Sequence, residues 1–327
     1  MKKILFTIFI FLTISLIFLK ANVTNSFAQS FNLGVYPPII QINANPPISI
    51  RAPFQVQNFS DQTLKLNVQI HPFSPSTKNN GDIDILWNTP ITGADNNIEN
   101  KFQILDDQGN YITQITLAPK QTKKMFLHVV LPPNEPPSDY YFTLIFISNS
   151  IATNQNTSST LQGGIGINVL LSIGPYSKIP QGSLEKFSAP LIVGSGPIPV
   201  KILVNNPNSF FITPHGNLVI YNMFNQIVGK VNLLPVNILA NNQRYIPDNK
   251  SGFLNQAVWN EKALFGIYRI KLSLLLTPNG PLFEKNIYFL ALPLNIILGI
   301  IIFCFLLTIT ILGIREKLKK NKISLDK

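Results

Sequence analysis

Residues 29–290 show almost no helical periodicity, because their apolar side chains recur at every second position or in short β-branched runs. Residues 64–70 are the clearest example, since apolar and polar residues alternate strictly there and the apolar ones share one face of an extended strand. Pro, Asn and Gly separate such runs at short intervals, as expected of turns between strands. The pattern predicts an all-β body.

The runs fall into two sets. Residues 29–176 carry roughly seven or eight of them, which predicts a first immunoglobulin-like β-sandwich. A second set follows the turn-rich stretch 174–180 and predicts a second sandwich over residues 177–290. Turn residues at 106–110, 222–226 and 279–280 predict tight connections between strands. The predicted fold class is all-β: two tandem immunoglobulin-like β-sandwiches plus one C-terminal transmembrane α-helix.

A faint repeat relates the two halves. Residues 55–61 read as a strand, an Asn and a turn, and residues 203–209 read in the same way. Two explanations stay open, namely a domain duplication or convergence on the same strand–turn chemistry.

The N-terminus has the parts of a secretory signal peptide. Lys2 and Lys3 precede an uncharged apolar run at 4–19, and small residues stand at Ser26 and Ala28. We predict a signal peptide at residues 1–28 that is cleaved after Ala28. An uncleaved anchor is the alternative, although the run is slightly short for a bilayer span of about 20 residues.

The C-terminal region predicts a membrane anchor. Residues 296–314 contain no charge, and a helix that is apolar on all sides has no face for water. We therefore predict a transmembrane helix at 291–314 and a basic cytoplasmic tail at 315–327. The predicted topology determinants are the basic residues that follow the run, because Lys and Arg mark the cytoplasmic side of a span: Arg315, Lys317, Lys319, Lys320 and Lys322. The predicted location is the cell membrane, single-pass, with the N-terminal domains extracellular and the C-terminus cytoplasmic.

Most of the formal net charge of +11 lies at these two ends, so it indicates topology and argues against nucleic acid as a partner. The single cysteine, Cys304, lies in the apolar C-terminal run, which excludes a disulfide scaffold and a thiol nucleophile in the body.

Three segments carry a family resemblance: VQNFSDQTLKLNVQI at 56–70, LAPKQTKKMFLHVVLPP at 117–133 and YYFTLIF at 140–146. With the order of the parts, they make the chain resemble the WxL-interacting proteins of Gram-positive bacteria. The resemblance implies a signal peptide, a peptidoglycan-binding domain, a second domain that binds host or partner proteins, and a C-terminal anchor. It carries over no individual binding residue.

Residues typical of catalysis are scarce. His71, His128 and His215 are far apart in the sequence and show no metal-ligand spacing. Asp82 and Asp84 place two carboxylates on one face of a strand, which would suit a hydrolase, but a solvated turn explains them better. We therefore predict no enzymatic activity, no cofactor and no metal site.

The candidate binding contacts are Trp87 and Trp259, because both indoles stand near predicted loops and could stack on a sugar or anchor a protein. The alternative is a tryptophan in the core of each sandwich.

The predicted function is a non-catalytic, membrane-anchored cell-surface protein that holds a cell-wall polymer or another surface protein, with the lipid bilayer as a further partner through residues 291–314. The alternative function is a structural or chaperone-like assembly component of the cell envelope that acts by β-strand pairing.

Overall fold

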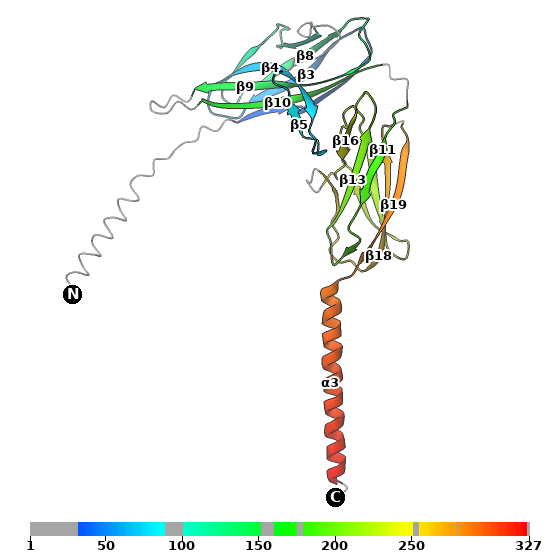
Figure 1. Ribbon diagram of the computed structural model, residues 1–327. Coiled ribbons are helices and arrows are strands. Elements are labelled where there is room, and N and C mark those ends of the chain that lie inside the picture. The colour runs from blue at the N-terminus through cyan, green and yellow to red at the C-terminus, as the bar shows by residue number, and fades with distance from the viewer. Residues whose placement is uncertain are drawn as a thin grey trace, which may run out of the picture.

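The computed structural model describes residues 32–88, 101–151, 160–174, 179–250, 255–278 and 280–325. The predicted signal peptide lies outside these residues. Figure 1 shows two β-structured bodies in succession, with a helix after the second.

The first body is a sandwich of two sheets. One sheet has the strand order β1-β3-β8-β6, and the other has the order β2-β10-β9-β4-β5, with β7 also paired to β4. Its strands are β1 (Leu33–Tyr36), β2 (Ile39–Ala44), β3 (Ile48–Asn58), β4 (Leu64–Pro75), β5 (Ile83–Ile85), β6 (Phe102–Leu105), β7 (Gln114–Leu117), β8 (Thr122–Leu131), β9 (Asp139–Ile151) and β10 (Thr160–Ile173).

The alternation in the sequence explains how the two sheets of this sandwich pack together. In β4, Leu64, Leu66 and Val68 are buried while Lys65 points outward. Side chains from both sheets, such as Leu127 of β8 and Phe142 of β9, meet in one hydrophobic core. The strands predicted at 64–70, 124–131, 140–147 and 166–173 are therefore confirmed.

The chain changes sheets near its start. β1 pairs antiparallel with β3 in one sheet, and after Pro37 and Pro38 the chain continues as β2, which pairs parallel with β10 in the other sheet. A proline cannot donate to a strand ladder, so the two prolines suit this change of partner.

The second body is also a sandwich. One sheet has the order β11-β13-β16, with β17 paired to β13, and the other has the order β12-β19-β18-β14-β15. Its strands are β11 (Ser183–Ser188), β12 (Ile192–Val193), β13 (Ile198–Asn206), β14 (His215–Tyr221), β15 (Ile227–Asn232), β16 (Asn242–Tyr245), β17 (Ala257–Trp259), β18 (Gly266–Leu275) and β19 (Leu282–Ala291). Buried side chains of both sheets, including Ile202, Leu218 and Leu272, form its core.

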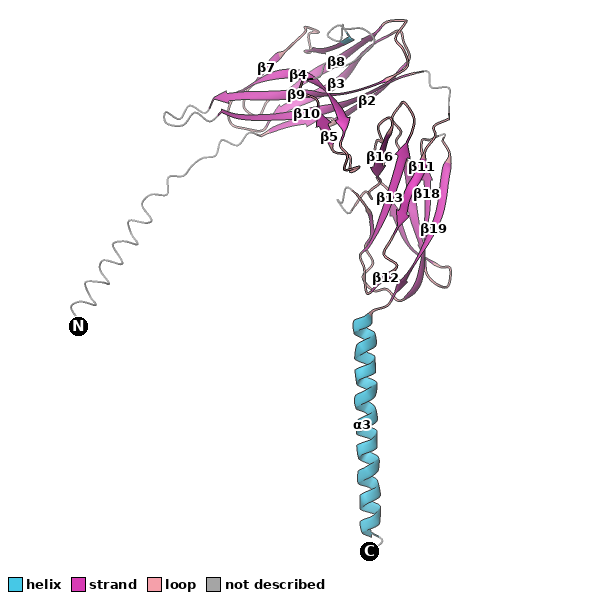
Figure 2. Cartoon of the chain, in the orientation of Figure 1, coloured by secondary structure: helices cyan, strands magenta, loops and turns pink. Residues whose placement is uncertain are grey.

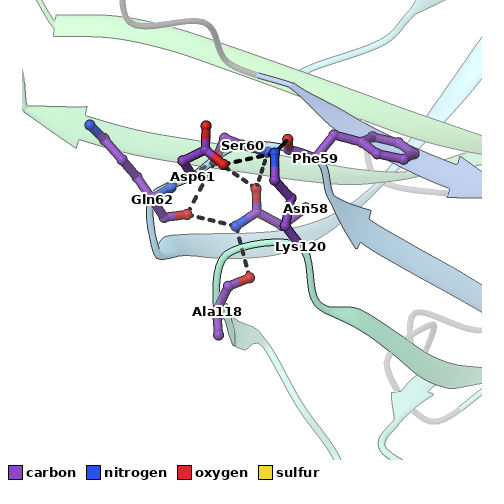
Figure 3. Close-up of polar contacts among 7 residues, drawn as sticks. All are labelled: Asn58, Phe59, Ser60, Asp61, Gln62, Ala118 and Lys120. Carbon is purple, nitrogen blue, oxygen red and sulfur yellow. Dashed lines mark hydrogen bonds and ion pairs between the residues drawn. The ribbon is translucent and has the colours of Figure 1, made fainter.

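The sequence repeat corresponds to one shared structure. In the first sandwich the buried Asn58 donates through Nδ2 to three carbonyl oxygens, of Gln62, Leu117 and Ala118. Its Oδ1 accepts from the backbone N–H and the hydroxyl of Ser60 (Figure 3).

Asn206 repeats this arrangement in the second sandwich. Its Nδ2 donates to the carbonyl oxygens of Phe210, Ile238 and Leu239, and its Oδ1 accepts from the backbone and side-chain amides of Asn208. Both asparagines are 0% exposed. In each domain, therefore, one buried amide ties the turn after a long strand to a distant loop.

Two of the predicted turns are confirmed. The backbone N–H of Gly109 donates to the carbonyl oxygen of Asp106, with Gly109 at a φ of 89°. The N–H of Asn225 donates to the carbonyl oxygen of Asn222 in the hairpin between β14 and β15. The turn predicted at 279–280 includes residue 279, which lies outside the described residues.

The predicted membrane anchor is corrected. The last element is α3 (Leu294–Leu325), which follows the second sandwich (Figure 2). In the part of the chain that the structure describes, no helix has both the length and the apolarity needed to cross a membrane. The helix does not stop where the apolar run stops but continues through the basic residues that were predicted to lie beyond it. The predicted transmembrane helix at 291–314, its contact with the lipid bilayer and the single-pass location are therefore contradicted.

Candidate functional site: an interdomain pocket and an open strand edge

The two sandwiches contact each other through a small apolar cluster. Phe73 and Leu170 of the first sandwich are buried against Leu239 of the second. The ring of Tyr141 stacks on Phe73 with 6.0 Å between centroids, and Phe211 packs against the same cluster. Burial of these side chains favours contact between the domains.

Hydrogen bonds between the domains accompany the cluster. The N–H of Phe211 donates to Asp139 Oδ2 at 2.7 Å, and the N–H of Ala240 donates to the Tyr141 hydroxyl at 3.1 Å. The N–H of Tyr245 donates to the carbonyl oxygen of Asn79 at 2.8 Å, which joins the turn before β5 to β16. Figure 1 shows β5 facing β16 across this junction. Directional bonds of this kind fix the position of one domain on the other.

A pocket of about 110 Å³ lies at this junction and is lined by both domains. From the first sandwich come apolar residues such as Ile39 and Leu170 together with the polar Asp82 and Asn168. The second sandwich contributes a run of polar residues along β16 and the loop before it: Asn237, Asn242, Gln243 and Arg244. The pocket is therefore amphipathic, with polar groups of both domains around an apolar base.

Arg244 is the cationic residue of the pocket lining. Its Nη1 donates to the carbonyl oxygen of Asn237 at 2.8 Å, whereas its Nε is buried and has no hydrogen-bond partner within the described residues. The guanidinium packs on Gly81, where a Cβ would lie 2.1 Å from Nη2 and the backbone φ is +90°. Burial lowers the pKa of Arg244 from its usual value, and the nearby Asp82 opposes that shift.

The second feature is an open edge on β10. Pairing with β9 extends over residues 160–172, but β2 covers the other side of β10 only from Asn168 to Ile173. Within the described part of the chain, no strand pairs with residues 160–167 on that outer side. Unpaired backbone donors and acceptors along a strand are a template for another chain.

The predicted binding contacts have different environments. Trp87 is 53% exposed, and its indole lies 4.9 Å from the ring of His71. Trp259 is only 7% exposed and packs against both Tyr268 and Phe289 in the core of the second sandwich. The alternative of a core tryptophan therefore fits Trp259, and Trp87 remains available for contact. The structure does not bring the two together, because each belongs to a different sandwich.

The other sequence candidates are not part of a catalytic arrangement in the structure. Asp82 lines the pocket, but Asp84 is exposed in β5. His128 contacts Ser49, and His71 contacts Gln69. Among the described residues there is no group of His, Cys, Asp and Glu that could hold a metal ion. The predicted topology determinants are residues of α3: Arg315, Lys317, Lys319, Lys320 and Lys322.

Sequence reasoning missed Arg244 and the open edge of β10. Nothing in the local pattern around Arg244 distinguishes it from other surface cations, since its position depends on the packing of two domains. The glycines at 163, 164 and 166 were a usable signal, because glycine within a strand can mark close approach by another backbone.

No protein-family model and no curated protein matches the chain by sequence. Three solved structures of bacterial proteins described as chaperones are similar in fold. The E. coli chaperone DraB has a TM-score of 0.35 and 12% identity, over 79% of this chain and 98% of DraB. The class 5 fimbriae chaperone CfaA has a TM-score of 0.32 and 13% identity, over 80% and 100% of the two chains. The Pseudomonas aeruginosa chaperone CupB2 has a TM-score of 0.32 and 8% identity, over 77% and 97%. Function must be argued from the site, because one fold serves many functions.

Proposed function

We propose that this protein is a non-catalytic, chaperone-like assembly component that binds a partner protein by β-strand pairing along the outer edge of β10. The observation that carries the proposal is the half-covered edge of this strand, which is paired over residues 160–172 on one side and only from Asn168 onward on the other. Main-chain hydrogen bonds to an added strand supply affinity without requiring a catalytic residue.

Apolar side chains next to the open edge support the proposal. Ile165 of β10 is only partly buried, and so are Leu33 and Val35 of β1, which packs near β10 from the opposite sheet. A strand placed along β10 would bury these three side chains further, so backbone pairing and apolar burial favour the same position.

The glycines of the edge fit the same role. Gly164 is exposed and has room around it, with only ordinary contacts where a Cβ would lie. Three glycines between residues 163 and 166 weaken the strand on its own, because each adds backbone entropy and contributes no side chain. They also leave the backbone accessible to a second chain.

This reading is the alternative that the sequence raised, and it is better supported than a membrane-held tether for a cell-wall polymer. Trp87 is the feature that a polymer would use, by stacking on the exposed indole. The two readings differ in which surface contacts the partner.

The test is crosslinking in the native cells with the full chain. A photoreactive residue replaces Gly164 in one variant and Trp87 in a second, and the control carries it at the exposed Asp107 in the turn after β6. We expect a discrete protein adduct at position 164 and none at position 107. Hydrogen exchange on the purified adduct should show protection of alternate amides within residues 160–167.

Adducts with wall polymer at position 87, together with no protein adduct at position 164, would favour the tether. A second variant, Gly164→Pro, removes a backbone N–H that points to the open edge and should abolish copurification of the partner. Equal copurification with wild type and Gly164→Pro would contradict pairing at this strand.

A further inference from the structure

We propose that the pocket between the two sandwiches is a binding site for a small oxyanion, a carboxylate or a phosphate group, held by Arg244. The inference does not depend on strand pairing at β10. It rests on the charge of the pocket, the amide groups of its lining that have no partner within the described residues, and its apolar side chains.

Asp82 lies in the pocket lining with Arg244, but the described residues give Arg244 no ion pair, and the Asp82 carboxylate is engaged with other groups. Asp82 Oδ2 accepts from Asn80 Nδ2 at 2.7 Å and lies 3.9 Å from Lys78 Nζ. Lys78, Asp82 and Arg244 together have one positive charge in excess, which favours an anion at the pocket.

The neutral groups of the lining also present donors. Asn168 Oδ1 accepts from the Thr143 hydroxyl, and Asn237 Oδ1 accepts from the Thr213 hydroxyl. Asn242 Oδ1 accepts from the N–H of Gln243. With these oxygens engaged, the three side-chain NH₂ groups have no hydrogen-bond partner within the described residues and are free to donate to a ligand.

The shape and polarity of the pocket suit a small group. A volume of about 110 Å³ accommodates several atoms, because a single water needs roughly 10–15 Å³. Phe73, Leu170 and Leu239 form an apolar base, and a low local dielectric strengthens charge-assisted hydrogen bonds.

The experiment is a titration of the full chain with sodium phosphate and, separately, sodium acetate, at an ionic strength kept constant with sodium chloride. Isothermal titration calorimetry and the side-chain NMR signals of arginine report binding. We expect saturable binding of at least one oxyanion and a loss of tenfold or more in affinity with Arg244→Gln. The two salts distinguish a phosphate ligand from a carboxylate ligand.

Arg269→Gln is the matched control. Arg269 also has a buried Nε without a partner within the described residues. It belongs to β18, packs over Tyr221 of β14 and is not part of the pocket lining. Its substitution should leave the affinity within about twofold of wild type. Equal losses with both variants would show that general surface charge, and not the pocket, binds the anion, and would overturn the proposal.

A second variant covers the case in which Arg244→Gln disturbs the contact between the domains. Asn168→Asp keeps the acceptor for the Thr143 hydroxyl but replaces a free donor of the pocket lining with a negative charge. It should reduce the affinity tenfold or more. Saturable binding that is unchanged in Asn168→Asp, or no saturable binding by wild type with either salt, would refute the site.

Discussion

At the scale of single residues, the buried amides of Asn58 and Asn206 have the same structural role in the two domains. Asn58 and Asn206 are both 0% exposed, and each donates to three carbonyl oxygens. Removing the side chain removes these hydrogen bonds together, and one intramolecular hydrogen bond contributes about 0.5–1.5 kcal/mol. Each of these two side chains therefore contributes several hydrogen bonds to the stability of its domain.

We expect Asn58→Ala and Asn206→Ala each to lower the free energy of unfolding by about 3 kcal/mol, because several hydrogen bonds of a buried amide are lost together. Urea unfolding followed by circular dichroism measures the change. Asn286→Ala serves as the control, since Asn286 is exposed on β19 and should change stability by less than about 0.5 kcal/mol. Equal effects at all three positions would contradict the role of the buried amides.

A buried ion pair gives the second prediction at this scale. Lys101 Nζ lies 2.8 Å from Glu135 Oε2, with the two side chains 7% and 1% exposed, and the Tyr140 hydroxyl donates to Glu135 Oε1 at 2.5 Å. Lys101→Met leaves a buried carboxylate without its cation and should lower the free energy of unfolding by about 3–5 kcal/mol.

The double variant Lys101→Met with Glu135→Gln removes both charges and keeps an acceptor for Tyr140. It should recover most of the loss in the same urea experiment. If the double variant were as unstable as Lys101→Met alone, the uncompensated charge would not be the cause.

At the scale of elements, the turn after β6 couples stability to pH. Hydrogen bonds to the Asp106 carboxylate lower its pKa. The largest contribution comes from the backbone N–H of Asn110, and the Asn110 side chain and the N–H of Gln108 add to it. A carboxylate whose pKa is lowered on folding stabilises the fold above its unfolded value, near 3.8, and loses that contribution as the pH falls through the lower folded value.

We therefore expect wild type to lose stability relative to Asp106→Asn as the pH is lowered from about 5 to about 2. Urea unfolding across this range measures the difference, and an NMR titration of the Asp106 carboxyl group gives its pKa directly. A titration midpoint at or above the usual aspartate value would contradict the hydrogen-bonded carboxylate.

The elements were also the part of the fold that sequence could predict. Strict alternation in residues 64–70 specifies a strand and the face that it buries, as β4 confirms. Pairing partners could not be read in this way, because the parallel pairing of β2 with β10 joins residues far apart in the chain. Trp259 shows the same limit, since its burial depends on Tyr268 and Phe289 from other strands.

At the scale of the whole molecule, the domain contact is small and specific. The Tyr141 hydroxyl accepts from the N–H of Ala240 in the second sandwich and donates to Asp139 Oδ2 in the first. The same Asp139 oxygen accepts from the N–H of Phe211. A few hydrogen bonds, together with the apolar cluster around Phe73, therefore connect two cores that are otherwise separate.

Tyr141→Phe should loosen this contact without unfolding either sandwich, because the ring keeps its packing on Phe73 and only the hydroxyl is lost. We expect small-angle scattering to show a broader range of interdomain distances, with an unchanged circular dichroism spectrum. Val130→Ala, on an exposed strand position far from the contact, should leave the scattering unchanged. Identical scattering from wild type and Tyr141→Phe would contradict the role of the hydroxyl.

The change of sheets between β1 and β2 has a consequence for how the first sandwich opens. One short stretch of chain is hydrogen-bonded to β3 on one side of the core and to β10 on the other. Neither sheet can swing away without pulling that stretch from its second partner. The two sheets should thus behave as one cooperative unit, and native-state hydrogen exchange should give the amides of β3 and β10 a common opening free energy as denaturant is added.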